Sequence, residues 1–143
     1  MSLKTIGEGH STNDGYNIQT FESTYDFALT NASANAVIEL IQIPAGSIVN
    51  EVIVEVLTVE DGGTFDIGDG NDVDGYHDGI SATVATTNSL SLVLSEAAPN
   101  TVLGYSNGQK LYTAADSIDI KVLGQTFDEM KIRVRAIVTR TSN

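Results

Sequence analysis

Apolar and polar residues alternate along two long stretches of the chain, 48–60 and 129–140. One face of the first stretch is purely aliphatic and carries Val52, Val54 and Val56. Its other face is mixed and carries Glu51, Ile53, Glu55 and Leu57. In the second stretch Ile132, Val134, Ala136 and Val138 point one way, and Lys131, Arg133, Arg135 and Ile137 point the other. A period of two residues is typical of a β-strand with one buried face, so both stretches are predicted to be strands whose aliphatic side meets a core.

Shorter apolar runs, bounded by Gly, Pro, Asn or Asp, predict seven further strands. They lie at 24–30, 36–43, 64–69, 89–94, 100–105, 109–114 and 117–124. Residues 70–89 are predicted to be a loop anchored by Tyr76 and Ile80. No window shows a sustained apolar stripe at helical spacing, so no helix is expected. Short strands at a spacing of roughly 8–12 residues predict an all-β fold, an antiparallel β-sandwich that is jelly-roll-like.

The N-terminal segment differs from the rest of the chain. Residues 1–22 are rich in Gly, Ser, Thr and Asn, and too few apolar side chains are present to form a core. The apolar residues are spaced along the segment: Leu3, Ile6, Tyr16, Ile18 and Phe21. This spacing favours an extended or flexible arm that lies on another surface. We therefore expect an arm at 1–22 and a β-sandwich domain at 23–143.

Composition excludes several classes of function. The chain has 143 residues, the size of one domain, and no cysteine, which removes disulfides, thiolate metal sites and cysteine nucleophiles. No stretch resembles a signal peptide or a membrane-spanning helix, so neither export nor membrane contact is expected. The net charge is −12, and such a chain repels phosphate, so we expect no nucleic-acid partner.

The glycine-rich and aspartate-rich stretch GGTFDIGDGNDVDG at 62–75 is a candidate calcium loop. An EF-hand register that places Gly75 at position 6 leaves Gly70 and Ser81 at the two ends, where carboxylates are needed. Calcium-binding β-helix repeats require tandem copies, and only one copy is present. Turn formation is therefore favoured, with Asp and Asn side chains bonding nearby backbone N–H groups. If calcium binds, its predicted ligands are Asp66, Asp69, Asn71, Asp72 and Asp74.

No arrangement of residues points to catalysis. The two histidines, His10 and His77, are far apart in sequence, and no nucleophile-elbow pattern or phosphate-binding loop is present. The stretch Tyr76–His77–Asp78 is predicted to be an exposed loop tip. Paired carboxylates could support glycoside hydrolysis, but sugar sites use aromatic platforms and the chain has no Trp. We expect no enzyme activity and no cofactor.

Six of the seven Lys and Arg residues lie after residue 109. Lys131, Arg133 and Arg135 form a basic ladder on one face of the last predicted strand. Glu51 and Glu55 form an acidic pair on one face of the long strand at 48–60. If the two strands are neighbours in one subunit, the opposite charges pair across them. If the strands belong to different subunits, the same complementarity holds an oligomer in register. The residues alone leave both explanations open.

Three stretches resemble small virion proteins of tailed bacteriophages. They are IPAGSIVNEVIVEVLTVEDGGTFDIGDGNDVDGY at 43–76, LYTAADSIDIKVLG at 111–124 and EMKIRVRAIVTR at 129–140. The shared order is a PAG turn, a long Val/Ile strand, a Gly-rich hairpin, a GDGxDxDG turn and a strand of the form YxAADxIDI. The resemblance covers about half of the chain and consists of strand and turn motifs.

The resemblance implies a capsid decoration, or cement, protein. Such a protein is a β-sandwich subunit, often a homotrimer, that binds the major capsid protein. It would be made in the host cytoplasm and would lie on the capsid surface of the virion. Because these proteins have no active site, the resemblance transfers no functional residue. The alternative is a tail or fibre-associated adhesin that binds host surface glycans, with calcium at 66–74. A secreted carbohydrate-active enzyme is a third class.

Overall fold

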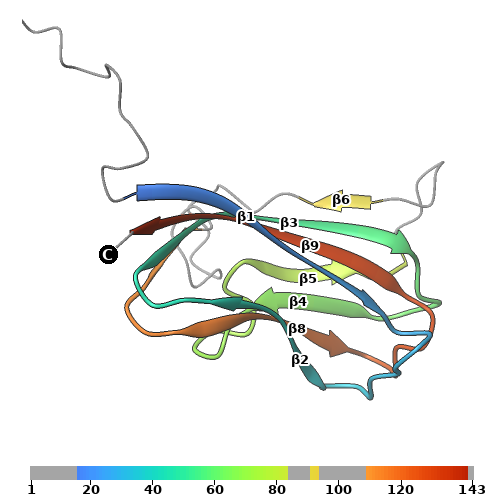
Figure 1. Ribbon diagram of the computed structural model, residues 1–143. Helices are drawn as coiled ribbons and strands as arrows, with labels where there is room; N and C mark the ends of the chain where they lie inside the picture. The colour runs from blue at the N-terminus through green and yellow to red at the C-terminus, as the bar shows by residue number, and fades with distance from the viewer. Residues whose placement is uncertain (1–15, 84–90, 94–108, 142–143) are drawn as a thin grey trace, which may run out of the picture.

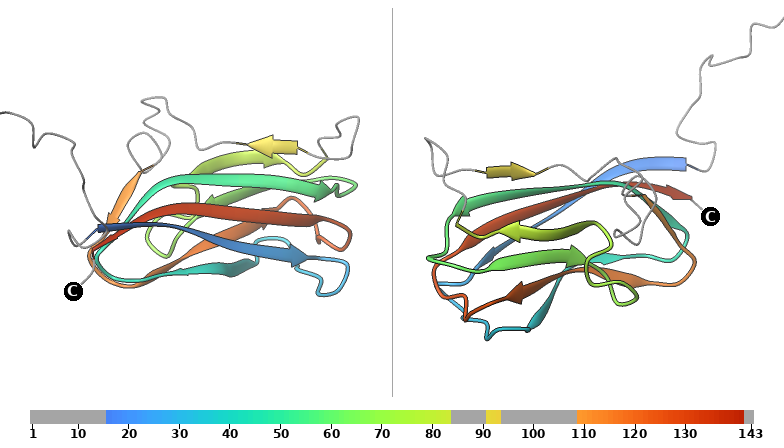
Figure 2. Two further views of the ribbon diagram at one scale, coloured as in Figure 1. Left: turned by 45° about the horizontal axis from the view of Figure 1, so that its top comes forward. Right: turned by 180° about the vertical axis from the view of Figure 1, so that it is seen from behind.

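The computed structural model describes residues 16–83, 91–93 and 109–141. Within these ranges the chain forms nine β-strands and no helix, so none of them contains a helix that could cross a membrane. The strands form two antiparallel sheets that lie face to face, as Figures 1 and 2 show. The predicted all-β class and antiparallel sandwich are confirmed, and the finer jelly-roll path stays a prediction.

The first sheet is built around the long strand β3. Its five strands are β1 (Tyr16–Asp26), β9 (Lys131–Thr141), β3 (Ser47–Thr58), β6 (Ser91–Val93) and β7 (Lys110–Tyr112). The strand order is β1-β9-β3-β6, and β7 pairs with the start of β3. The two strands predicted from the clearest alternation, β3 and β9, are therefore direct neighbours.

The second sheet has the order β2-β8-β4-β5. Its strands are β2 (Val37–Ile43), β8 (Asp116–Leu123), β4 (Thr64–Gly68) and β5 (His77–Ser81). Strand β2 ends just before Pro44, which has no N–H to donate to a ladder. The chain then reverses into β3 through Gly46, whose φ of 81° suits glycine. A short turn thus carries the chain from one sheet to the other.

The core lies between the two sheets. The predicted aliphatic faces of β3 and β9 both point into it and are fully buried; they are formed by Val52, Val54, Val56, Ile132, Val134, Ala136 and Val138. The second sheet contributes Ile41, Ile43, Phe65, Ile67, Ile118, Ile120 and Val122. Each fully buried aliphatic side chain contributes about 1.5–3 kcal/mol of transfer free energy, so these two faces stabilise most of the sandwich.

The predicted boundary of the N-terminal arm is wrong. Strand β1 begins at Tyr16, not after residue 22, and it pairs with β9 from Tyr16↔Thr141 to Asp26↔Lys131. Six of the eleven residues of β1 are Tyr, Ile, Phe or Thr, which favour strands, and β9 supplies a pairing partner along its whole length. Residues 1–15 of the predicted arm lie outside the described residues, as do the predicted strand at 100–105 and His10.

The predicted loop at 70–89 contains a strand, β5, that pairs with β4. Tyr76 and His77 are buried rather than exposed at a loop tip, and only Asp78 of that triplet is exposed. The His77 ring reaches across the sandwich, where its Nε2 lies 3.0 Å from the backbone oxygen of Val52 in β3. Strand β5 escaped prediction because Asp78 and Gly79 interrupt its alternation.

A buried carboxylate ties the end of β3 to the turn before β9. One oxygen of Glu60, Oε2, accepts hydrogen bonds from the backbone N–H groups of Asp128, Glu129 and Met130 at 3.2, 3.0 and 2.9 Å. Charge-assisted bonds of this kind are stronger than bonds between neutral groups. Glu60 therefore fixes where β9 enters the first sheet.

Candidate functional site

The Gly/Asp-rich loop at 69–76 is organised by Asp69, which is fully buried. Its Oδ1 accepts hydrogen bonds from the backbone N–H groups of Asn71 at 2.9 Å and Asp72 at 3.0 Å. This arrangement is an Asx turn, in which an Asp side chain stands in for a backbone carbonyl. The turn formation predicted for this stretch is confirmed at Asp69.

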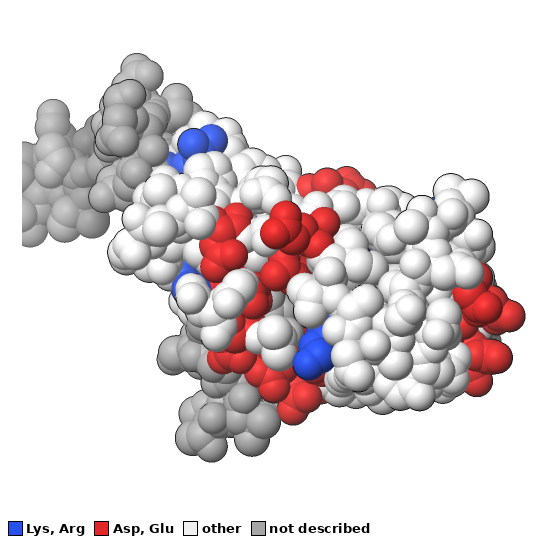
Figure 3. Space-filling view, turned by 90° about the horizontal axis from the view of Figure 1, so that it is seen from below, with Lys and Arg blue, Asp and Glu red and all other residues white. Residues whose placement is uncertain are grey.

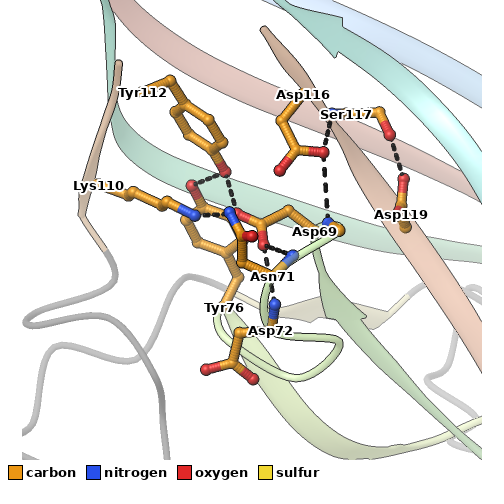
Figure 4. A network of polar contacts seen from close by, with 10 residues as sticks. Asp69, Asn71, Asp72, Tyr76, Lys110, Tyr112, Asp116, Ser117 and Asp119 are labelled. Carbon is orange, nitrogen blue, oxygen red and sulfur yellow. Dashed lines mark hydrogen bonds and ion pairs between the residues drawn. The ribbon is translucent and has the colours of Figure 1, made fainter. Parts of the chain in front are cut away.

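The second oxygen of Asp69 joins the loop to strand β7, as Figure 4 shows. Asp69 Oδ2 lies 2.7 Å from Lys110 Nζ and 2.7 Å from the hydroxyl of Tyr112. The Tyr112 hydroxyl in turn lies 2.7 Å from that of Tyr76. Because Tyr112 donates its proton to Asp69, Tyr76 donates to Tyr112. Burial raises the pKa of both tyrosines, so both stay protonated donors at neutral pH.

Gly68 lets the loop fold back over the outside of the second sheet. A Cβ at this position would lie 2.0 Å from the backbone oxygen of Asp72 and 2.3 Å from the carbonyl carbon of Val73. No side chain fits there, because the obstacle is backbone and not a movable side chain. The glycine of the GDG motif is thus a packing requirement of the loop.

The other predicted calcium ligands do not converge with Asp69. Asp66 Oδ1 accepts a hydrogen bond from the backbone N–H of Gly79 at 2.8 Å, on β4 and not in the turn. The carboxyl group of Asp72 forms a hydrogen bond with that of Asp74, and this bond raises the pKa of Asp72. The side chain of Asn71 is exposed. No group of three or more His, Asp or Glu side chains that could hold a metal ion occurs in 16–83, 91–93 and 109–141. In this geometry the carboxylate of Asp69 serves to hold the loop.

A hollow of about 350 Å³ lies beside this network, lined by Gly70, Asn71 and residues 110–116. On its wall, Asp116 Oδ1 accepts from the backbone N–H of Ser117 at 2.8 Å and from that of Gly70 at 3.3 Å. These bonds hold the start of β8 against the loop. The acidic side chain on the wall, Asp116, therefore anchors backbone groups.

The charged ladder is an in-chain feature of the first sheet. Glu55 of β3 accepts hydrogen bonds from Arg133 Nε at 2.8 Å and Arg135 Nη1 at 2.6 Å, and a further one from Arg133 Nη2. Glu22 of β1 flanks the same two arginines at 3.4 and 3.8 Å. At Glu55 the opposite charges therefore pair between neighbouring strands of the same chain, which is the first of the two explanations given above.

The remaining charged residues predicted at an interface lie on the same outer face without joining the cluster. Glu51 pairs in register with Ile137, and Lys131 lies between Asp26 and Thr58. Neither Glu51 nor Lys131 makes an ion pair with another described residue. The basic ladder is thus neutralised at Arg133 and Arg135 and makes no ion pair with a described residue at Lys131.

The predicted apolar interface residues divide between the two sides of β1. Ile18 points outward and is 73% exposed, whereas Phe21 packs against the core. The prediction of Phe21 as an arm residue is wrong, because β1 turns its odd-numbered side chains inward. For Tyr16 the structure describes only the backbone, which pairs with Thr141. Leu3 and Ile6 lie outside the described residues.

The outer face of the second sheet is acidic, as the red surface in Figure 3 shows. Glu39 of β2 lies in register with Asp119 of β8, and Asp66 of β4 with Lys121. Asp119 is 6% exposed, since the loop at 69–76 covers this part of the sheet. Burial, together with the nearby carboxylates, raises the pKa of Asp119 to about 6.

Sequence patterns did not single out Lys110, Tyr112 or Asp119. Lys110 and Tyr112 are two residues apart in β7, so both point toward the inside of the sandwich. Lysine is rarely buried without a partner, so a lysine on the inward side of a strand is a signal for a buried carboxylate. That signal identifies the need for a partner but not its position 41 residues away.

A scan against protein-family models finds no match, and a search of curated proteins finds none either. Among solved structures, the fold matches chains in three phage capsids. A chain of the cyanophage Pam1 capsid asymmetric unit has a TM-score of 0.66 and 18% identity, over 92% of this chain and 89% of that chain. A chain of the capsid of Ralstonia phage GP4 has a TM-score of 0.60 and 14% sequence identity, and the match covers 89% of this chain and 86% of that chain. A chain of the acidic stable capsid of Helicobacter pylori bacteriophage KHP30 has a TM-score of 0.56 and 13% sequence identity, and the match covers 85% of this chain and 86% of that chain. At these identities the likeness concerns the fold.

Proposed function

We propose that this chain is a structural protein of a bacteriophage virion. It decorates the capsid, binds the major capsid protein as an oligomer, expected to be a homotrimer, and acts by binding rather than by catalysis. The observation that carries the proposal is the likeness of the whole sandwich to chains in three phage capsid structures, over 85–92% of its length. The sequence motifs at 43–76, 111–124 and 129–140 point independently to the same class.

The chemistry of the described residues supports a binding role. The carboxylate of Asp69 is engaged by two backbone N–H groups, a lysine and a tyrosine, so it is committed to holding the loop. Glu55 is engaged by two arginines in the same way. A carboxylate that is held by several donors is a poor general base, because those donors stabilise its charged form. Rigid strands with satisfied charges suit a protein that presents a fixed surface.

Multivalency would make such binding effective. A trimer engages three equivalent sites on a lattice, so modest contacts in each subunit add up to strong retention. A chain of this kind would lie on the capsid surface after synthesis in the host cytoplasm.

Co-sedimentation with shells tests the proposal. The purified chain is mixed with empty, undecorated shells that are assembled from the major capsid protein of the same phage. We expect it to pellet with them saturably, in a fixed ratio to the capsid subunits, and to run as a trimer in a solution mass measurement. A chain that stays in the supernatant at every concentration overturns the proposal, and a glycan array then tests the adhesin alternative.

A further inference from the structure

An apolar row crosses the outer face of the first sheet at the end where the chain enters β1. Ile18 of β1 lies in register with Thr139 of β9, which lies in register with Ile48 of β3, and Ile48 in turn faces Leu111 of β7. Ile18 is 73% exposed and Leu111 is 57% exposed, while Ile48 is half-buried. We call Ile18, Ile48 and Leu111 the apolar row.

The surroundings of the apolar row are close to neutral. In the next row of the sheet Ile137 separates Thr20 from Glu51, and beyond it Arg135 lies between Glu22 and Ile53. The arginine charges there are balanced by Glu22 and Glu55. The central parts of protein interfaces are depleted in unpaired charge and enriched in apolar side chains and arginine, and this face has that composition.

The acidic face of the second sheet offers the opposite surface. Its exposed apolar residues are isolated: Val37 lies on β2 at 49% exposure, and Val73 lies in the loop at 39%. Val37 lies in register with Lys121, which in turn lies in register with Asp66, so Val37 belongs to a charged row and not to an apolar one. Carboxylates are costly to remove from water unless a partner supplies opposite charge, which disfavours docking of this face on a near-neutral surface.

We propose that the outer face of the first sheet is the docking face, and that the apolar row seats on the protein lattice of the virion shell. The inference rests on the proposed function and identifies the face that carries it. The occupant is a largely apolar, near-neutral protein surface, because the row offers aliphatic contact and the positive and negative charges on the rest of the face nearly balance. The acidic second sheet then points away from the shell and into solvent.

The position of the chain ends supports this orientation. Residues 1–15 join the described residues at Tyr16, two positions before Ile18, and β9 ends at Thr141, opposite Tyr16. The described part of the chain therefore begins and ends beside the apolar row.

Paired serine substitutions test the docking face. The variant Ile18→Ser/Leu111→Ser removes the two most exposed members of the apolar row. Its matched control, Val37→Ser/Val73→Ser, removes two exposed apolar side chains from the other side of the molecule. Because all four positions are exposed, we expect both proteins to fold with unchanged circular dichroism. We expect the first variant to bind empty shells of the same phage at least tenfold more weakly than the unsubstituted chain, and the control to bind within twofold.

Cysteine labelling gives a second readout that does not depend on affinity. The chain has no cysteine, so Leu111→Cys and Val37→Cys each introduce a single reactive thiol. We expect shell binding to protect the thiol at 111 from a maleimide and to leave the thiol at 37 reactive. Equal labelling at 111 with and without shells, or protection at 37 instead, overturns the docking face.

The outcomes separate this inference from the proposed function. If the unsubstituted chain does not bind shells, the proposed function fails. If it binds and the Ile18→Ser/Leu111→Ser variant binds equally well, the function stands and the docking face is wrong. If that variant instead loses its trimeric solution mass, the apolar row is a contact between copies of this chain, which also overturns docking of the row on the shell.

Discussion

The two outer faces of the sandwich come from the same period-two alternation but carry different chemistry. On the first sheet, two outward arginines of β9, Arg133 and Arg135, are met by Glu22 and Glu55 from the neighbouring strands. On the second sheet, Glu39 and Asp119 face each other across β2 and β8. The first face is therefore near neutral with an apolar end, while the second is acidic (Figure 3).

The difference bears on which of the two faces would dock in the proposed virion protein. Charges that are paired across strands cost little to bring against a partner, because their fields largely cancel before binding. The carboxylates on the opposite face keep that face negative, which disfavours its association with other acidic surfaces. The net charge of −12 is thus distributed unevenly, and three of the seven basic residues, Lys131, Arg133 and Arg135, lie on the face that we expect to dock.

The largest predicted effect concerns the loop that covers the acidic face. Asp69→Ala leaves Lys110, Tyr112 and two backbone N–H groups without their acceptor, so we expect a loss of about 3–5 kcal/mol in the free energy of unfolding. Urea unfolding followed by circular dichroism measures it. Asn71→Ala, at an exposed position in the same loop, is the control and should change stability by less than about 0.5 kcal/mol. A loss below about 1 kcal/mol for Asp69→Ala would mean that the network does not hold the loop.

The next effect concerns the paired charges of the docking face. Glu55→Ala removes a carboxylate shared by two arginines, and we expect a loss of about 2 kcal/mol, between the values for buried and exposed pairs. Glu51→Ala, four residues away on the same face, should cost less than about 0.5 kcal/mol because Glu51 makes no ion pair with a described residue. Thermal unfolding of both variants compares them. Equal losses would show that the cluster at Glu55 carries no specific stability.

The smallest effect concerns pH and the acidic face. Burial raises the pKa of Asp119 from 3.8 to about 6, so between these values the folded chain holds a proton that the unfolded chain releases. Stability should therefore fall as the pH rises from about 4 to about 6 and should stay lower above that range. The raised pKa values of Asp66 and Asp72 act in the same direction.

The variant Asp119→Asn isolates this contribution. At pH 7.5 we expect it to be more stable than the unsubstituted chain by about 1–2 kcal/mol after allowance for solvent screening, and at pH 4 the two should be equal. Melting temperatures across this pH range provide the measurement. A variant that is less stable at both pH values would show that the Ser117 hydrogen bond to Asp119, and not the charge, dominates at this position.

The sequence predicted the parts of the fold that depend on local alternation. Val52 and Val54 in β3, and Ile132 and Val134 in β9, point inward as expected because period two fixes their direction once the strand exists. Strand β5 was missed because its only aliphatic residue, Ile80, follows Gly79, whose φ of 66° breaks the extended pattern. Local pattern therefore identified β3 and β9 but missed β5 and most of β1.

The candidate sites were harder to predict because they depend on long-range neighbours. The motif at 62–75 indicated a tight acidic turn, but the lysine and tyrosine that hold Asp69 come from β7, 41 and 43 residues later. Likewise, Leu111 lies in a predicted strand, yet its alignment with Ile18 follows only from the strand order β1-β9-β3 and the pairing of β7 with β3. Register across strands, and not residue type, creates the apolar row.

Electron cryomicroscopy of shells reconstituted with this chain tests the central claim most directly. We predict density for the sandwich on the outer surface of the shell, with β1, β9 and β3 toward the lattice and Ile18 and Leu111 in contact with it. In that map the acidic strands β2 and β8 lie on the solvent side. Shells without added density, or a sandwich seated through β2 and β8, would contradict the account.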